Sequence, residues 1–355
     1  MAVSNDVLSQ TLLAIHPETS MALTRTTAFL QAAKENGKIH YFGGKDSAQA
    51  GSYKLRIPIE VAESTITTDV SGTGYETLDL SVQDATRYAE FTWGRFVRPV
   101  IISKLERSQN SGDAGVVALA ETRYRNALGS LKRSVNAQII GAADPKFATL
   151  GTLNGMATGG STTGFLEAVA AGSQVNTVGG LSKSTFSTVP GWQNQFADAA
   201  GAFSTNGLAA FRSIRTRAAL NREMARDDKT FHAVILHPTT KDLYEAALFS
   251  NARYANTKDL DGGKFVLMFE DAPVYADPNF LTTAGADIGA NGLKLSGYFL
   301  NLDGVTLAIH EEADFTFSAF QDIPNQDVDI AKITFMGGLI AKNLGSSGML
   351  VDALA

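Results

Sequence analysis

Residues 113–140 decide the fold, and they read DAGVVALAETRYRNALGSLKRSVNAQII. Apolar residues recur there at intervals of three or four, which is the spacing along one face of an α-helix. These residues are Val117, Ala120, Tyr124, Leu128, Leu131, Val135 and Ile139. Gly141 and Pro145 follow the stretch and are typical of a helix end. The pattern predicts one helix roughly 42 Å long, although helices in globular proteins average only about 11–12 residues.

A second strong pattern lies before this helix. Tyr53–Val61 alternates apolar and polar residues, which is typical of a half-buried strand. Pro58 restricts that strand to a sheet edge or a two-stranded ribbon. Phe91–Ile102 is rich in aromatic and β-branched residues and indicates further strand. We predict one long hairpin over residues 43–96, with its tip near Ser71–Gly74. An isolated ribbon is barely stable, so this one needs a partner surface.

The first 42 residues are predicted to form an N-terminal arm. Met21–Asn36 indicates a short helix with Ser20 as its N-cap and Gly37 at its end. A lone helix of this length is marginal in water. We therefore expect the arm to dock either on this chain or on a neighbouring molecule.

The chain after the long helix mixes loop, helix and strand signals. Residues 151–191 contain nine glycines and few charges, which indicates a loop or an insertion. Asp303-Gly304 is a two-residue hairpin signal between strands expected at Tyr298–Leu302 and Val305–Ile309. The other expected helices are Thr205–Arg226 and Thr239–Ser250, and the other expected strands are Phe231–Leu236, Ala272–Phe280, Val328–Met336 and Leu339–Leu344. This order predicts an α+β fold without a βαβ rhythm.

The composition is that of a folded protein. Among 355 residues, 44% are hydrophobic and 19% are charged, below the usual ~25% charged, so part of the surface is expected to be buried against other chains. A net charge of -6 argues against a dedicated nucleic-acid binder. We find no signal-peptide pattern and no apolar run near the ~18 residues that span a bilayer. The sequence therefore predicts a soluble protein, made in a cytoplasm, with no membrane contact.

Catalytic and metal-binding patterns are weak. The chain has no cysteine, which excludes disulfides, thiolate metal sites and cysteine nucleophiles. His232 and His237 flank a predicted strand and do not form a zinc-type pair. Gly179–Ser184 resembles a phosphate-binding loop but has Ser182 where the motif needs glycine before Lys183. We expect no catalytic residues, no cofactor and no metal.

Charge is segregated along the chain. Ile57–Thr86 contains no lysine or arginine but six acids, so the outer ribbon is strongly negative. These acids are Glu60, Glu63, Asp69, Glu76, Asp79 and Asp84. Residues 95–133 instead hold eight bases against three acids. These bases are Arg95, Arg98, Lys104, Arg107, Arg123, Arg125, Lys132 and Arg133.

Two interpretations of this segregation stay open. The acidic ribbon can simply protect a sheet edge from aggregation. Alternatively, the acidic ribbon of one copy lies on the basic base of the loop and the long helix of the next copy, so that both sets are inter-subunit contacts.

Several segments together resemble a known family, the major capsid proteins of tailed bacteriophages with the Hong Kong 97-type fold. The residues that carry this resemblance are Tyr88–Trp93, Pro99–Glu106, Gln109–Gly112, Ser134–Gly141, Lys332–Gly338, Lys342–Gly345 and Gly348–Leu350. The similarity covers most of the chain, and the Gly-rich stretch 151–191 is the part without a match.

The resemblance implies a Hong Kong 97-like α+β fold of four parts. Its parts would be an N-terminal arm (1–42), an extended loop that overlaps a neighbour (43–96), a peripheral domain (97–145 and 310–355) with a spine helix (113–141), and an axial domain (146–309) that includes the Gly-rich insertion. One member of the family cross-links lysine to asparagine between subunits. Lys45 and Asn343 lie in suitable segments, but no local feature supports that chemistry, and we expect no cross-link.

The function implied by the resemblance is that of a non-enzymatic capsid protein. Identical copies would form pentamers and hexamers and close into an icosahedral shell around double-stranded DNA, which they would touch by weak, non-specific contacts. Further partners would be a separate scaffolding protein, a portal and a decoration protein. The protein would assemble in the host cytoplasm and reside in the virion.

Two other functions stay open. An encapsulin-type compartment shell has the same fold, and its cargo is protein rather than nucleic acid. A soluble enzyme or binding protein of an unrelated class would be a monomer in solution.

The complementarity interpretation predicts the effect of reversing two ribbon charges. Glu76→Lys combined with Asp79→Lys should weaken self-association, most strongly at low salt, where exposed charges are least screened. Sedimentation over a salt series measures the effect, and assembly that is unchanged across the series would contradict the interpretation.

Overall fold

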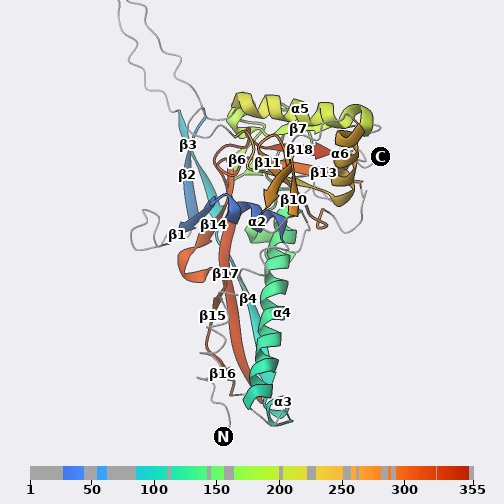
Figure 1. Cartoon of the computed structure of the whole chain (residues 1–355). Coiled ribbons are helices and arrows are strands. Elements are labelled where there is room, and N and C mark those ends of the chain that lie inside the picture. The colour runs from blue at the N-terminus through green and yellow to red at the C-terminus, as the bar shows by residue number, and fades with distance from the viewer. Residues whose placement is uncertain are drawn as a thin grey trace, which may run out of the picture.

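The computed structural model describes the greater part of the chain (Figure 1). The described residues are 27–43, 54–61, 85–109, 113–141, 145–155, 164–199, 203–221, 229–250, 257–260, 264–280, 287–288, 293–324 and 326–351. Within these ranges the structure is a mixed α and β fold, built on two large sheets that share one long helix.

The long helix is α4 (Asp113–Ile140), as predicted. It runs along a six-stranded sheet, counted over the described residues, whose central strand is β17 (Val328–Ala341). The other strands of this sheet are β1 (Ile39–Phe42), β4 (Gly94–Ser103), β14 (Val305–His310), β15 (Thr316–Phe317) and β16 (Gln321–Asp322). The antiparallel pairing of β4 with β17 covers ten residue pairs, from Gly94 with Gly337 to Ser103 with Val328. Short helices α3 (Lys104–Gln109), η1 (Pro145–Leu150) and η3 (Glu311–Ala313) flank this sheet.

The second sheet has eight strands among the described residues, in the order β7-β18-β13-β8-β11-β10-β9 with β12 beside β13. Their bounds are β7 (Gln195–Asp198), β8 (Ala233–Leu236), β9 (Thr257–Leu260), β10 (Lys264–Phe269), β11 (Ala272–Ala276), β12 (Asp287–Ile288), β13 (Leu293–Leu300) and β18 (Gly348–Val351). Helices α5 (Phe203–Asn221) and α6 (Pro238–Ser250) cover one face, where Phe211 and Tyr244 stack with ring centroids 5.0 Å apart. The other face joins the core at the end of α4.

The predicted hairpin is confirmed at its base. Strand β2 (Lys54–Glu60) pairs antiparallel with β3 (Thr86–Thr92) over seven residue pairs, as a separate two-stranded sheet. The predicted tip, near Ser71–Gly74, lies outside the described residues. A second small hairpin, β5 (Thr177–Val178) with β6 (Leu181–Ser182), and the turn η2 (Pro190–Trp192) lie in the Gly-rich segment.

The described part of the N-terminal arm docks on this chain. Helix α2 (Ala28–Glu35) begins after Thr27, its N-cap, and the predicted N-cap Ser20 lies outside the described residues. Phe29 is fully buried against α4 and the six-stranded sheet. Strand β1 then pairs parallel with the edge of β14. Gly37, in the left-handed region at φ 62°, ends the helix as predicted, because glycine adopts this conformation without a steric cost.

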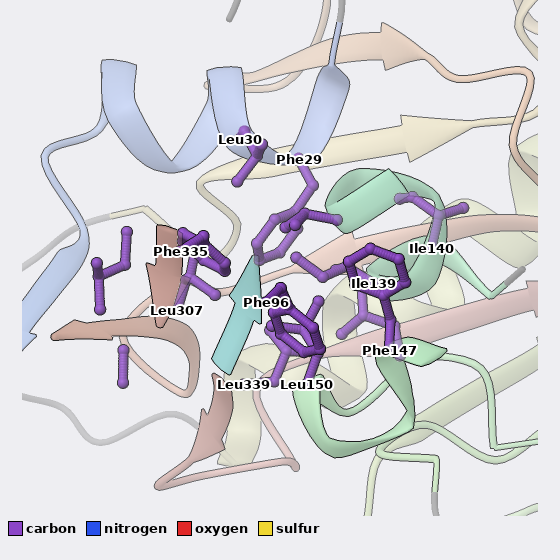
Figure 2. Packing of buried hydrophobic residues seen from close by; sticks show 14 of the residues in the cluster. Phe29, Leu30, Phe96, Ile139, Ile140, Phe147, Leu150, Leu307, Phe335 and Leu339 are labelled. Atoms are coloured by element: carbon purple, nitrogen blue, oxygen red, sulfur yellow. The ribbon is translucent and has the colours of Figure 1, made fainter. Parts of the chain in front are cut away.

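One aromatic cluster forms the centre of the core (Figure 2). The ring of Phe96 in β4 stacks on Phe147 at 4.6 Å and on Phe335 of β17 at 6.3 Å between centroids. Phe29 from α2 and Ile139 from α4 close around these rings. Five elements from four separate regions of the sequence therefore bury their apolar side chains together, and burial of this kind is the main driving force of folding.

A buried polar junction connects α2, α4 and the end of β11. The Asn136 side chain of α4 donates to Asp277 Oδ2 at 2.6 Å and accepts from the Phe29 backbone amide at 3.1 Å. Asp277 Oδ1 accepts from the backbone and side-chain nitrogens of Asn279 at 2.9 and 2.7 Å. Asn136 and Asp277 are at most 1% exposed. The junction therefore fixes the arm and the two sheets relative to one another.

Two predicted strand connections are wrong. Asp303-Gly304 does form a turn, but it leads from β13 in the eight-stranded sheet to β14 in the six-stranded sheet, so no hairpin forms. The strands predicted at Val328–Met336 and Leu339–Leu344 are one strand, β17, which runs through Gly337 and Gly338. Strand β18 pairs with β13 and β7 in the eight-stranded sheet.

The junction predicts a large effect of a single substitution. Asn136→Ala should lower the free energy of unfolding by roughly 2–4 kcal/mol, because it leaves the Phe29 amide and a buried carboxylate oxygen without their partner. Asn126→Ala, at an exposed position of the same helix, is the control and should change stability by less than about 0.5 kcal/mol. Urea unfolding of both variants measures this, and equal midpoints would contradict the assignment.

Candidate subunit-contact surfaces

The predicted acidic set is described at one position. Glu60 is the last residue of β2, exposed and opposite Thr86 of β3. The other predicted acids, Glu63, Asp69, Glu76, Asp79 and Asp84, lie outside the described residues. Their contribution to subunit contacts stays a prediction.

Four of the predicted bases pair with acids of the same chain. Arg107 lies 3.0 Å from the buried Asp329, and Lys104 lies 3.0 Å from Asp322 and 3.6 Å from Asp327. Arg123 pairs with Glu106, and its hydrogen bond, aided by the Ser103 amide, holds the pKa of Glu106 below its usual value. Arg125 pairs with Glu121 one turn earlier in α4. The positive charge at the loop base and on α4 is therefore partly neutralised within the subunit.

Lys132 is not a surface residue, which corrects its place in the predicted contact set. Its side chain is 1% exposed, and its ammonium lies 5.0 Å from the ring centroid of Phe315. Burial lowers its pKa to about 8, although nearby Asp314 acts in the opposite direction. The cation is thus held inside the subunit by an aromatic face.

The remaining predicted bases have different exposures. Arg98 is half-buried and donates to the Ser130 hydroxyl of α4. Arg133 is exposed on α4, and Arg95 is exposed on β4. Arg95 therefore lies on the face of the sheet opposite to Arg98, because side chains alternate along a strand.

An exposed apolar surface lies on that opposite face of β4 and β17. We call it the outer sheet face, and its residues are Arg95, Val97, Pro99, Ile101, Ile330, Lys332, Thr334 and Met336. Val97 and Ile101 are 49% and 44% exposed, and Ile101 is directly opposite Ile330. The inner face of the same strands is buried against α4. This face is therefore a candidate surface for contact with another protein.

The ribbon also exposes an apolar side chain. Tyr88 of β3 is 61% exposed and lies directly opposite Pro58 of β2. Leu55, Ile57 and Phe91 fill the other face of the ribbon, which is buried on this subunit. The outer sheet face and Tyr88 were not predicted from the sequence. The sequence of β4 does carry a signal for the outer sheet face, because apolar residues lie on both faces of this strand and not on one face alone.

The histidines near β8 have structural partners. His237 Nδ1 accepts from the Thr239 amide at 3.2 Å and thereby caps the start of α6, and His232 Nδ1 accepts from the Leu302 amide at 3.3 Å. No cluster of three potential metal ligands occurs among the residues that the structure describes. Asn343 uses its side chain within the subunit, donating to the Asn221 carbonyl at 2.9 Å, while Lys45 lies outside the described ranges.

Comparison with solved structures identifies the class of fold. The chain superposes on the cyanophage A-1(L) capsid with a TM-score of 0.55 at 15% identity, covering 85% of this chain and 88% of that one. The superposition on the capsid of the native GTA particle has a TM-score of 0.51 at 10% identity and covers 91% of this chain and 90% of that one. The superposition on the SrpI encapsulin of Synechococcus elongatus PCC 7942 has a TM-score of 0.50 at 11% identity and covers 88% of this chain and 84% of that one. No protein-family model and no curated protein matches the sequence.

The fold is therefore the one shared by these capsid and encapsulin subunits. More specifically, the chain has the Hong Kong 97-type fold of tailed-phage major capsid proteins, as the resemblance in sequence predicted. The domain boundaries within that fold stay a prediction.

The outer sheet face predicts a substitution that affects assembly more than folding. Ile101→Glu should raise the protein concentration needed for self-association by about tenfold or more, equivalent to about 1.4 kcal/mol, because it places a charge in an apolar contact. Leu220→Glu, at an 80% exposed position on α5, is the matched control and should assemble like the parent chain. Sedimentation over a concentration series distinguishes them, and equal behaviour of the two variants would contradict a contact at this face.

Proposed function

We propose that the chain is the major capsid protein of a tailed, double-stranded DNA bacteriophage. In this role identical copies form pentamers and hexamers that close into an icosahedral shell around the genome. The observation that carries the proposal is the combination of a fold shared with solved capsid subunits and two exposed surfaces, the outer sheet face and the exposed side of the ribbon. The role is structural rather than enzymatic.

The proposed contact joins the ribbon of one copy to the outer sheet face of the next. The ribbon carries acids at and beyond Glu60, and the outer sheet face carries Arg95 and Lys332 around its apolar centre. Apolar burial would supply affinity, and the opposite charges would fix the register of the two surfaces. This refines the predicted partner of the ribbon, because most bases on and near α4 are already paired within the subunit.

Other partners follow from the proposed role. Packaged DNA would touch the shell by weak contacts that do not depend on sequence, consistent with a chain of net charge -6. A separate scaffolding protein, a portal and a decoration protein complete the proposed set. Assembly would take place in the host cytoplasm and the product would be the virion. No described helix is long and apolar enough to cross a bilayer.

An encapsulin-type shell is the second candidate. The superposition on the SrpI encapsulin, which is described as a holo complex, favours keeping it. The two candidates differ in their contents, since a capsid encloses DNA and an encapsulin encloses protein cargo.

The content of particles formed in the native host tests the proposal. Particles purified with the chain should contain DNA that resists added nuclease until the shell is opened, and negative-stain images should show closed icosahedral shells. A nuclease-resistant protein cargo without DNA would favour the encapsulin. A chain that stays monomeric even when co-expressed with the scaffolding protein of its own operon would contradict both candidates.

A further inference from the structure

The Gly-rich segment and the residues directly after it form a buried polar cluster that has no part in the proposed subunit contact. We call it the Lys183 cluster, and its members are Glu167, Gln174, Lys183 and Asn194. The ammonium of Lys183 donates to Asn194 Oδ1 at 2.8 Å and to the Phe165 carbonyl at 2.7 Å, and lies 3.5 Å from Glu167 Oε1. All four members are at most 4% exposed. Lysine and glutamate are almost never this buried unless they are paired.

The cluster fixes the backbone on both sides of the β5–β6 hairpin. The Glu167 carboxylate accepts from the Val175 amide at 2.9 Å and from the Asn176 amide at 2.8 Å, directly before β5. The Lys183 amide, directly after β6, donates to the Asn176 carbonyl at 2.9 Å. The Gln193 side chain donates to the Lys183 carbonyl at 2.9 Å. A short hairpin of this kind would have little stability of its own, so its direction depends on these anchors.

The tip of this hairpin rests on the base of the ribbon. The Glu90 amide of β3 donates to the Gly179 carbonyl at 2.8 Å. A Cβ at Gly179 would lie 2.8 Å from the Ala89 Cβ and 2.9 Å from the Phe91 ring, closer than packed atoms tolerate. Only glycine therefore allows this approach, and its φ of 56° also favours glycine.

We propose that the β5–β6 hairpin, anchored by the Lys183 cluster, is a buttress that sets the angle at which the ribbon leaves the subunit. The effect of that angle on a shell rests on the proposed function. The described ladder of β2 and β3 is about 23 Å long, so a rotation of about 10° at its base would move its far end by about 4 Å. A repeated contact between identical copies closes into a shell of one size only when its geometry is fixed. The buttress thus specifies shell curvature.

Two neighbouring glycines provide a matched test. Gly179→Ala introduces a side chain against Ala89 and Phe91, whereas Gly180→Ala introduces one into open space at a similar left-handed φ of 80°. Both variants place alanine in the left-handed region, so their backbone strain is similar. Only Gly179→Ala also pushes against the ribbon. Lys183→Met is the third variant, since it removes the anchor without touching the ribbon.

The first readout is hydrogen exchange at β3 in unassembled subunits, followed by mass spectrometry. Exchange of the Glu90 amide should accelerate by about tenfold or more in Gly179→Ala and in Lys183→Met, and should stay within about twofold of the parent chain in Gly180→Ala. Equal protection in Gly179→Ala and Gly180→Ala would overturn the buttress. This readout does not depend on assembly, so it decides the buttress even if the proposed function fails.

The second readout is particle diameter in negative-stain images. Gly180→Ala should form shells of the parent size, whereas Gly179→Ala and Lys183→Met should form open sheets or shells of mixed size. A variant with a loosened Glu90 amide that still builds parent-sized shells would overturn the link to curvature. A parent chain that builds no shells under any condition would instead overturn the proposed function.

Discussion

The arrangement of this subunit depends on one buried carboxamide. Asn136, near the end of α4, bridges the Asp277 carboxylate and the Phe29 amide, and so joins the arm to the end of β11 in the eight-stranded sheet. Without it, one oxygen of the buried Asp277 carboxylate and the backbone amide at the start of α2 would lose their partner inside the subunit, which is costly. Tyr298 acts in the same place, since its hydroxyl donates to the Ile140 carbonyl at the end of α4 at 2.7 Å. Phe29, whose amide donates to Asn136, also belongs to the apolar cluster of Figure 2, so polar and apolar contacts act at the same place.

Because the two sheets are fixed relative to one another, the outer sheet face and the ribbon have fixed orientations on the subunit. Helix α4 buries the inner face of β4 and β17 and leaves the outer sheet face exposed. The ribbon leaves the body at a point defined by the β5–β6 hairpin, with Tyr88 on its exposed side. Charge then divides into two classes. Bases such as Arg107 and Lys104 serve the subunit itself, while Arg95 and Lys332 lie on a surface that a second copy can reach.

The sequence pattern of each segment predicted the long helix and the ribbon. The pairing of strands depends on contacts between distant segments, and local pattern does not predict it. The predicted helix 113–140 matches α4 because its apolar period persists over 28 residues, and Pro58 with its alternating neighbours was sufficient to predict a two-stranded ribbon. The Asp303-Gly304 turn is correct as a turn, but the choice of sheet on either side depends on pairing with distant strands. Gly337 looked like a strand end, yet a Cβ there would lie 2.8 Å from the Ala308 carbonyl, so glycine serves close packing within β17. For the predicted contact residues, the sequence shows which charges are present but not which acid each base pairs with.

The burial of Lys183 could not be predicted, because nothing in the neighbouring sequence distinguishes it from an exposed lysine.

The proposed function depends on a contact between the ribbon of one subunit and the outer sheet face of another. A cryo-electron microscopy reconstruction of assembled particles at side-chain resolution tests it most directly. We expect rings of five and six copies in which the β2–β3 ribbon covers Val97 and Ile101 of the adjacent copy, with acidic side chains near Arg95 and Lys332. The proposed contact would be wrong if the outer sheet face stays exposed to solvent in the particles and the ribbon contacts only its own subunit.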